Sequence, residues 1–157
     1  MGNGNTTGFE QLDDTLKSLI DQRGELILRK SLRAAGEVFQ AAVTEAAPVR
    51  TEGHGGNPKN PAWSLPPGAL KSDIHLSVGH DDHGNLRARV TPGKYTFPVA
   101  RWVEYGHELY AHGKKVGEVE AHPFIRPAFE ANSRAAEAAF AETFVGEIEK
   151  VVAKGKR

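Results

Sequence analysis

Apolar residues recur at intervals of three and four in the N-terminal third of the chain, the spacing of amphipathic helices. They are Phe9, Leu12, Leu16 and Leu19 in a first stretch, and Leu28, Leu32, Ala35, Phe39, Ala42 and Ala46 in a second. The first stretch predicts a short helix over about residues 9–20, which Gly24 separates from the next element. The second stretch predicts a long helix from Glu25 that Pro48 stops.

The middle of the chain alternates apolar and polar residues, as strands with one buried face do. Residues 74–78 and 86–90 alternate in this way on either side of the turn sequence HDDHGN, and together they predict a β-hairpin. A third strand is expected over residues 97–105, with Val103 and Tyr105 on one face and Pro98 at its start or on a sheet edge. Residues 107–120 predict a second loop or a small hairpin that turns between Gly113 and Lys115.

A second long helix is expected from Pro127 to about Val152. Its apolar side would carry Phe129, Ala136, Phe140, Phe144, Ile148 and Val151. Proline suits the first position of a helix because that position needs no N–H donor, so Arg126 would be the N-cap. Arginine is a poor cap, and the angle of this helix is therefore expected to depend on packing of Phe124 and Ile125.

These patterns predict an α+β fold in which two long amphipathic helices pack on a small antiparallel sheet of three to four strands. At 157 residues the chain is expected to form a single domain over 1–157. Residues 1–8 are glycine-rich and expected to be flexible. Residues 51–68 are rich in glycine and proline, so they predict an extended loop.

The amino-acid composition argues against several classes of function. Lysine plus arginine and aspartate plus glutamate are equal at 20 each, which favours protein partners over nucleic acid. The absence of cysteine excludes disulfides and thiolate chemistry. Neither a signal peptide nor a membrane span is expected.

Two histidine-containing stretches are candidate metal sites. In HELYAH, His107 and His112 are five residues apart, whereas the zinc-protease motif needs histidines four apart on a helix. The turn HDDH, from His80 to His83, could hold a cation, although turn chemistry alone explains its composition. Neither stretch predicts a metal site or a cofactor.

Two charged residues have open alternatives. Glu104 could be a buried acid, or a charge that protects a sheet edge from mispairing. Arg126 could bind an anion, or pair with Glu130 one helical turn later.

Four motifs in order resemble the tail-completion, or neck, proteins of long-tailed bacteriophages, which are often described as minor tail components. They are APVR followed by threonine, GALKSDI, WVEYG and HPFIRPAFEAN, and the resemblance covers about residues 25–145. The chain departs from the family pattern by an apparent insertion after Thr51, and by His107 and the stretch to Glu120 in place of a threonine after the EYG glycine.

The resemblance implies a virion protein, not an enzyme, made in the host cytoplasm and placed at the head-to-tail joint. It implies a homo-oligomeric ring, with six copies as one option, that binds tail-terminator and head-closure proteins and lets DNA pass without sequence-specific binding. No membrane partner is implied. We expect partner contacts at Arg50, Thr51, Trp63, Leu65, Tyr110 and Arg126.

The alternative is a small metal-dependent hydrolase that uses Glu104, His107 and His112. It requires these three side chains to converge in one pocket with perturbed protonation.

Overall fold

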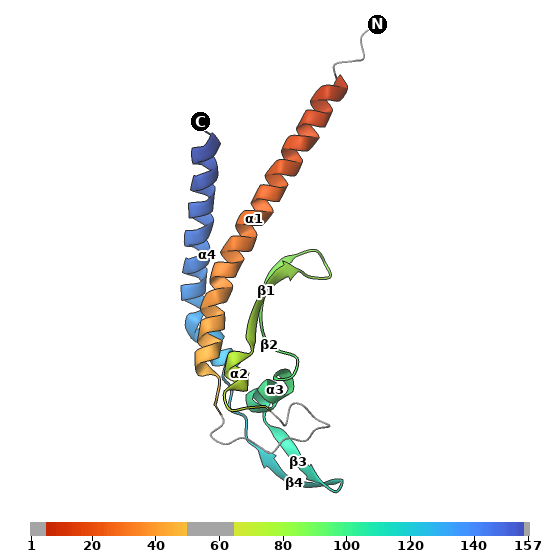
Figure 1. The fold of residues 1–157 in the computed structure, drawn as a ribbon, viewed down its shortest axis with the longest axis vertical. Coiled ribbons are helices and arrows are strands. Elements are labelled where there is room, and N and C mark those ends of the chain that lie inside the picture. The colour runs from red at the N-terminus through yellow and green to blue at the C-terminus, as the bar shows by residue number, and fades with distance from the viewer. Residues whose placement is uncertain (1–5, 50–64, 156–157) are drawn as a thin grey trace.

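The computed structural model describes residues 6–49 and 65–155, with side chains from residue 23 onward within these ranges. Two long helices lie side by side at one end of the molecule and diverge toward their far ends, and the remaining elements gather at the end where they meet (Figure 1). In chain order the elements are α1 (Thr6–Ala46), α2 (Ala69–Ser72), β1 (Ile74–His80), β2 (Leu86–Pro92), α3 (Phe97–Tyr105), β3 (His107–Ala111), β4 (Lys114–Val119) and α4 (Ile125–Gly155). None of the helices in these ranges is long and apolar enough to cross a membrane.

Helix α1 is continuous, so the predicted break at Gly24 is wrong. A glycine inside a helix costs only about 1 kcal/mol relative to alanine, which the long flanking segments can tolerate. Thr6 to Gly8 belong to this helix, and the rest of the predicted flexible N-terminus, residues 1–5, lies outside the described residues. The predicted C-terminal end is confirmed, because α1 ends at Ala46, two residues before Pro48.

The core lies where α1, α4 and the first hairpin meet. Its buried residues are Val43, Ala47, Leu70, Ile74, Ala100, Phe124 and Ala128. Phe39 of α1 stacks on Phe129 of α4 with ring centroids 4.2 Å apart. Because α4 packs chiefly on α1, while α1 also covers β1 and β2, the expectation that both helices lie on one sheet is wrong.

The predicted hairpin over residues 74–90 is confirmed as β1–β2, an antiparallel pair in which Ile74 faces Pro92 and His80 faces Leu86. Its turn is organised by Asp81, whose carboxylate accepts the backbone N–H groups of His83 and Asn85. The composition of the HDDH stretch is therefore explained by the hairpin turn that it forms. Gly36 lets α1 approach this ribbon closely, because a Cβ there would overlap the side chain of Leu76.

The third predicted strand is wrong, because residues 97–105 form helix α3. In so short a segment, apolar residues fit both the two-residue period of a strand and the roughly 3.6-residue period of a helix. The proline near the start suits the first turn of a helix as well as a strand edge. The α+β class is confirmed, but the single sheet of three to four strands is replaced by two separate two-stranded sheets.

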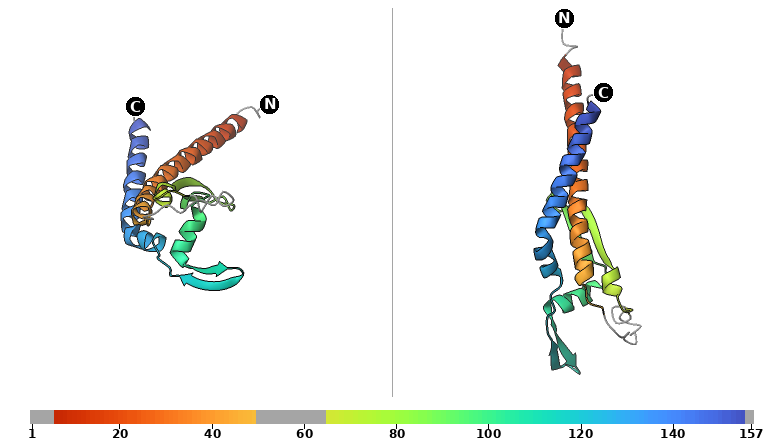
Figure 2. Two further views of the ribbon diagram at one scale, coloured as in Figure 1. Left: turned by 60° about the horizontal axis from the view of Figure 1, so that its bottom comes forward. Right: turned by 90° about the vertical axis from the view of Figure 1, so that its left-hand side faces the viewer.

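The small hairpin over residues 107–120 is present as β3–β4. It turns at His112 and Gly113 and not between Gly113 and Lys115 as predicted, because Lys114 already pairs with Ala111. The positive φ angles of His112 and Gly113, 51° and 76°, are those of a tight two-residue turn. The hairpin stands away from the body of the molecule (Figure 2).

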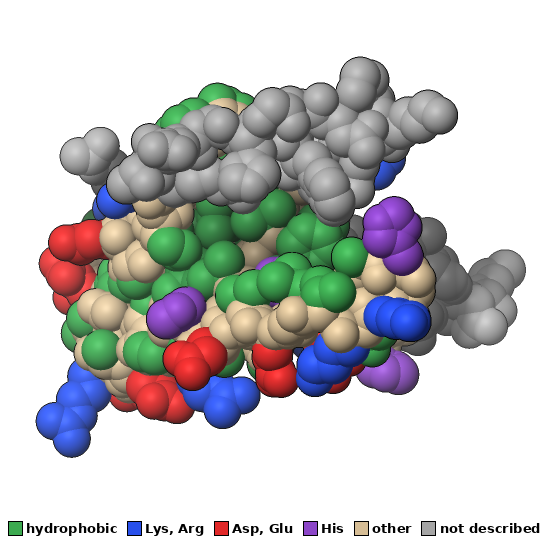
Figure 3. Space-filling view, turned by 90° about the horizontal axis from the view of Figure 1, so that it is seen from below, with side chains coloured by type: hydrophobic (Ala, Val, Ile, Leu, Met, Phe, Trp, Pro, Cys, Tyr) green, Lys and Arg blue, Asp and Glu red, His purple; other side chains and the backbone are tan. Residues whose placement is uncertain are grey.

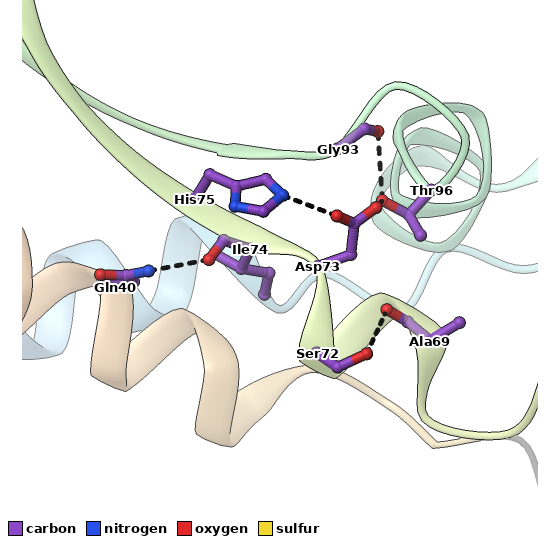
Figure 4. Close-up of polar contacts among 8 residues, drawn as sticks. All are labelled: Gln40, Ala69, Ser72, Asp73, Ile74, His75, Gly93 and Thr96. Carbon is purple, nitrogen blue, oxygen red and sulfur yellow. Dashed lines mark hydrogen bonds and ion pairs between the residues drawn. The ribbon is translucent and has the colours of Figure 1, made fainter.

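A polar cluster around Asp73 fixes the start of β1 within the GALKSDI motif (Figure 4). Its carboxylate accepts the Thr96 hydroxyl at 2.7 Å and contacts His75 Nε2 at 2.6 Å, and its backbone carbonyl accepts the N–H of Gly93. The hydrogen bond from Thr96, which has the larger effect, and the hydrogen bond with His75 both lower the pKa of Asp73. Gln40 of α1 donates to the carbonyl of Ile74 at 2.8 Å, which holds the strand against the long helix.

Candidate interaction surface

The first turn of α4 is capped by a side chain from another helix. The carboxylate of Glu104, near the end of α3, accepts the backbone N–H groups of Phe124 at 2.8 Å, Ile125 at 2.9 Å and Arg126 at 3.2 Å. The next residue, Pro127, has no N–H to satisfy. One carboxylate therefore takes all the free donors at this helix end.

The environment of Glu104 keeps it ionised. Its side chain is buried, with 7% of the residue exposed. Burial alone would raise its pKa, but the three backbone N–H groups and the charge of Arg126 outweigh that effect and hold the pKa below its usual value. The role of this residue is consequently structural: it anchors α3 to α4.

This arrangement corrects the predicted helix start. The helix begins at Ile125, so Pro127 is its third residue and Arg126 is not the cap. On the predicted third strand, Glu104 would be either a buried acid or a charge at a sheet edge. It is buried, but it lies on helix α3. Among the described residues Arg126 forms no ion pair with Glu130, and its charge acts instead on Glu104.

The same region brings the WVEYG and HPFIRP motifs together through the backbone. His122 donates its N–H to the carbonyl of Val103 at 2.7 Å. Gly106 has a φ of 71°, and a Cβ there would lie 2.6 Å from the carbonyl oxygen of Val119. Only glycine fits this crossing without strain.

An open groove of about 1050 Å³ lies between α3 and the start of α4. Its apolar lining includes Phe97 and Tyr105, which are 52% and 68% exposed, and Trp102. Arg101 and Arg126 add two positive charges that have no ion-pair partner within the described ranges. Seen from below, hydrophobic side chains gather in the middle of this end of the molecule, with charged groups around them (Figure 3).

Three of the six residues expected at partner contacts can be placed. Arg50, Thr51 and Trp63 lie outside the described residues. Leu65 is half-buried and lines a smaller hollow of about 190 Å³ beside Val49 and Leu70. Tyr110 is exposed on β3, with its hydroxyl donating to Glu108 at 2.7 Å, and Arg126 lines the groove. These three side chains therefore lie in different surroundings and do not form one site.

Phe97, Trp102 and Tyr105 were missed as surface candidates because their segment was predicted to be a strand. On a helix, Phe97, Arg101 and Tyr105 recur every four residues and share a face. That spacing was the signal in the sequence that could have identified them.

The hydrolase alternative gains no support from this geometry. The Glu104 carboxylate already accepts three backbone donors, and His112 lies in the turn at the tip of β3–β4. His107 lies against Trp102 instead, with ring centroids 5.3 Å apart. In the part of the chain that the structure describes, no group of three or more histidine and acidic side chains could hold a metal ion.

Comparison with known proteins identifies one family. The family described as "Bacteriophage HK97-gp10, putative tail-component" matches residues 10–106, from the first helix to the glycine of the EYG motif. No curated protein and no solved structure shows a significant match to the chain. The match ends at Gly106, one residue before β3 begins. Since it covers more than half of the chain, the protein belongs to the HK97-gp10-like family of bacteriophage tail components.

Proposed function

We propose that this protein is a structural component of the phage neck that joins the tail to the DNA-filled head. Copies associate side by side in a ring, for which six is one candidate number, and contact tail-terminator and head-closure proteins. DNA passes through the ring without sequence-specific binding. The observation that carries the proposal is membership of a phage tail-component family over residues 10–106.

The surface of the molecule supports an assembly role. Exposed aromatic side chains of α3 line a groove, and further aliphatic side chains are exposed on β3–β4 and on the far half of α4. Exposed apolar patches of this kind mark protein contacts. The equal numbers of acidic and basic residues support protein partners more than strong attraction to DNA.

The proposal is tested by interrupting the gene for this chain in the phage that encodes it and examining lysates by electron microscopy. We expect DNA-filled heads and separate tails, with joining restored by a plasmid copy of the wild-type gene. Joined, infectious particles in the absence of the protein would refute the proposed role.

A second plasmid tests the loop expected from the sequence to reach partners. A copy that lacks residues 52–67, of which 52–64 lie outside the described residues, is expected to fold but not to restore joining. Full restoration by this copy would leave the neck role intact and remove the loop from it.

A further inference from the structure

The hairpin β3–β4 is short of stabilising contacts within its own chain. A two-stranded hairpin is marginally stable by itself in water. Nearly all of its residues are exposed, and Trp102 contacts its first residue, His107, with the two rings tilted by 32°. The hairpin extends from the end of the molecule that carries the groove (Figures 1 and 2).

The two faces of the hairpin differ in polarity. On one face, Lys115 bonds to Glu108 at 2.6 Å and to Glu118 at 3.3 Å, and Tyr110 also donates to Glu108. This network satisfies the charges of that face locally. It leaves the opposite face to be explained.

The opposite face is apolar. The register pairs His107 with Val119 and Leu109 with Gly117, so these four residues share it. The small Gly117 leaves room for Leu109, whose Cδ1 would lie 3.7 Å from a Cβ built on the glycine. Leu109 is nevertheless 42% exposed, and within the described ranges the aromatic contact from Trp102 of α3 reaches this face at His107.

The charges of the groove and the hairpin are complementary. The groove lining carries Arg101 and Arg126 against the ionised Glu104, so its net charge is +1. The hairpin and the residue after it carry more acidic than basic side chains: Glu108, Glu118 and Glu120 against Lys114 and Lys115. Although Glu108 and Glu118 lie on the polar face and bond to Lys115, the hairpin with Glu120 keeps a net charge of −1, which favours its encounter with the positive groove.

We propose that the β3–β4 hairpin of one copy lies in the α3–α4 groove of the next copy. The single residue Gly106 links α3 to β3, and the hairpin projects away from the groove of its own chain (Figure 2). Two different surfaces then meet at every junction, and such heterologous contacts generate a ring when the rotation closes. This inference rests on the proposed side-by-side association and assigns the surfaces that make it.

The first test uses the natural absence of cysteine in the chain. Copies that carry Leu109→Cys are mixed under oxidising conditions with copies that carry Tyr105→Cys, at concentrations up to about 1 mM. We expect a disulfide-linked dimer of the two variants. The matched control replaces Tyr105→Cys by Val145→Cys, an exposed position on α4 with 53% of the residue accessible, and should give little of that dimer.

The second test measures mass in solution. Leu109→Asp puts a charge on the apolar face of the hairpin, and Tyr105→Asp puts a charge in the groove. Each variant alone should self-associate at least about tenfold more weakly than the wild type. A mixture of the two keeps one intact groove and one intact hairpin. It should therefore form a dimer of the two variants and no larger species.

Three results would overturn the inference. They are wild-type protein that stays monomeric at about 1 mM, cross-linking as efficient with Val145→Cys as with Tyr105→Cys, and variants that assemble like the wild type. None of them bears on whether heads and tails join without the protein, so failure of this inference is distinct from failure of the neck role.

Discussion

At Glu104 a single side chain performs a task that usually falls to the residue preceding a helix. Helices are normally capped by Ser, Thr, Asp or Asn at their own start. Here Phe124 precedes α4 and has no side-chain acceptor, so the carboxylate from α3 replaces it. The negative charge also suits the positive end of the α4 dipole.

Removing this carboxylate should destabilise the protein. Glu104→Ala leaves the N–H groups of Phe124, Ile125 and Arg126 without their acceptor, and we expect a loss of about 1–3 kcal/mol in the free energy of unfolding. Chemical denaturation measures it. The control is Glu130→Ala, an exposed site on α4, and equal unfolding midpoints for the two variants would contradict the capping role.

The same residue should make stability depend on pH in a defined direction. The pKa of Glu104 is lowered in the folded protein from an ordinary value of 4.5. Its stabilising contribution is therefore fully present above pH 4.5 and is lost as the pH falls through the lowered pKa.

The wild type and Glu104→Gln should consequently differ most at neutral pH, and the difference in unfolding free energy should shrink below about pH 4.5. Asp73 and Glu147 titrate with the same sign but are present in both proteins, so they cancel in the comparison. A difference that stays constant down to pH 3, or that grows, would show that ionised Glu104 is not responsible.

At the scale of elements, local pattern was informative where it was unambiguous. The helix up to Ala46, the hairpin β1–β2 and the final helix follow from periodicity in the sequence. Helix α3 does not, because nine residues with a proline near the start fit either period. The start of α4 was misplaced because its cap comes from a residue some twenty positions earlier in the chain, which no local rule detects. For the same reason the groove could not be predicted.

Substitutions at two glycines test how closely the end of α3 approaches β4. Gly106 and Gly113 both have positive φ, but only Gly106 faces backbone atoms close by. Gly106→Ala should cost about 2–3 kcal/mol, and Gly113→Ala about 1 kcal/mol, since the second change adds strain without a clash. Thermal unfolding of both variants checks the order, and an equal or reversed order would argue against the close crossing of α3 and β4.

Gly24 tests the continuity of α1. Nothing lies within 4 Å of a Cβ built there, so Gly24→Ala should lower the cost of the helix and stabilise the protein by up to about 1 kcal/mol. Denaturation and helix content measured by circular dichroism report the change. Lower stability would indicate that the helix is interrupted at this position.

At the scale of the whole molecule, two long helices diverge from an end that carries the small core, the groove and the projecting hairpin (Figure 1). The predicted apolar side of α4 is used only in part, because Ala136 is buried while Ile148 and Val151 are exposed. Such a shape leaves much apolar surface for other chains. It suits a tail component better than an enzyme that works alone.

The most direct test of the neck role is the position of this protein in the finished particle. Purified phage are labelled with gold-conjugated antibodies against the chain, or against a tag on it, and viewed by electron microscopy. Label confined to the joint between head and tail is the predicted result. Label along the tail or at its far tip, or particles that lack the protein, would contradict it.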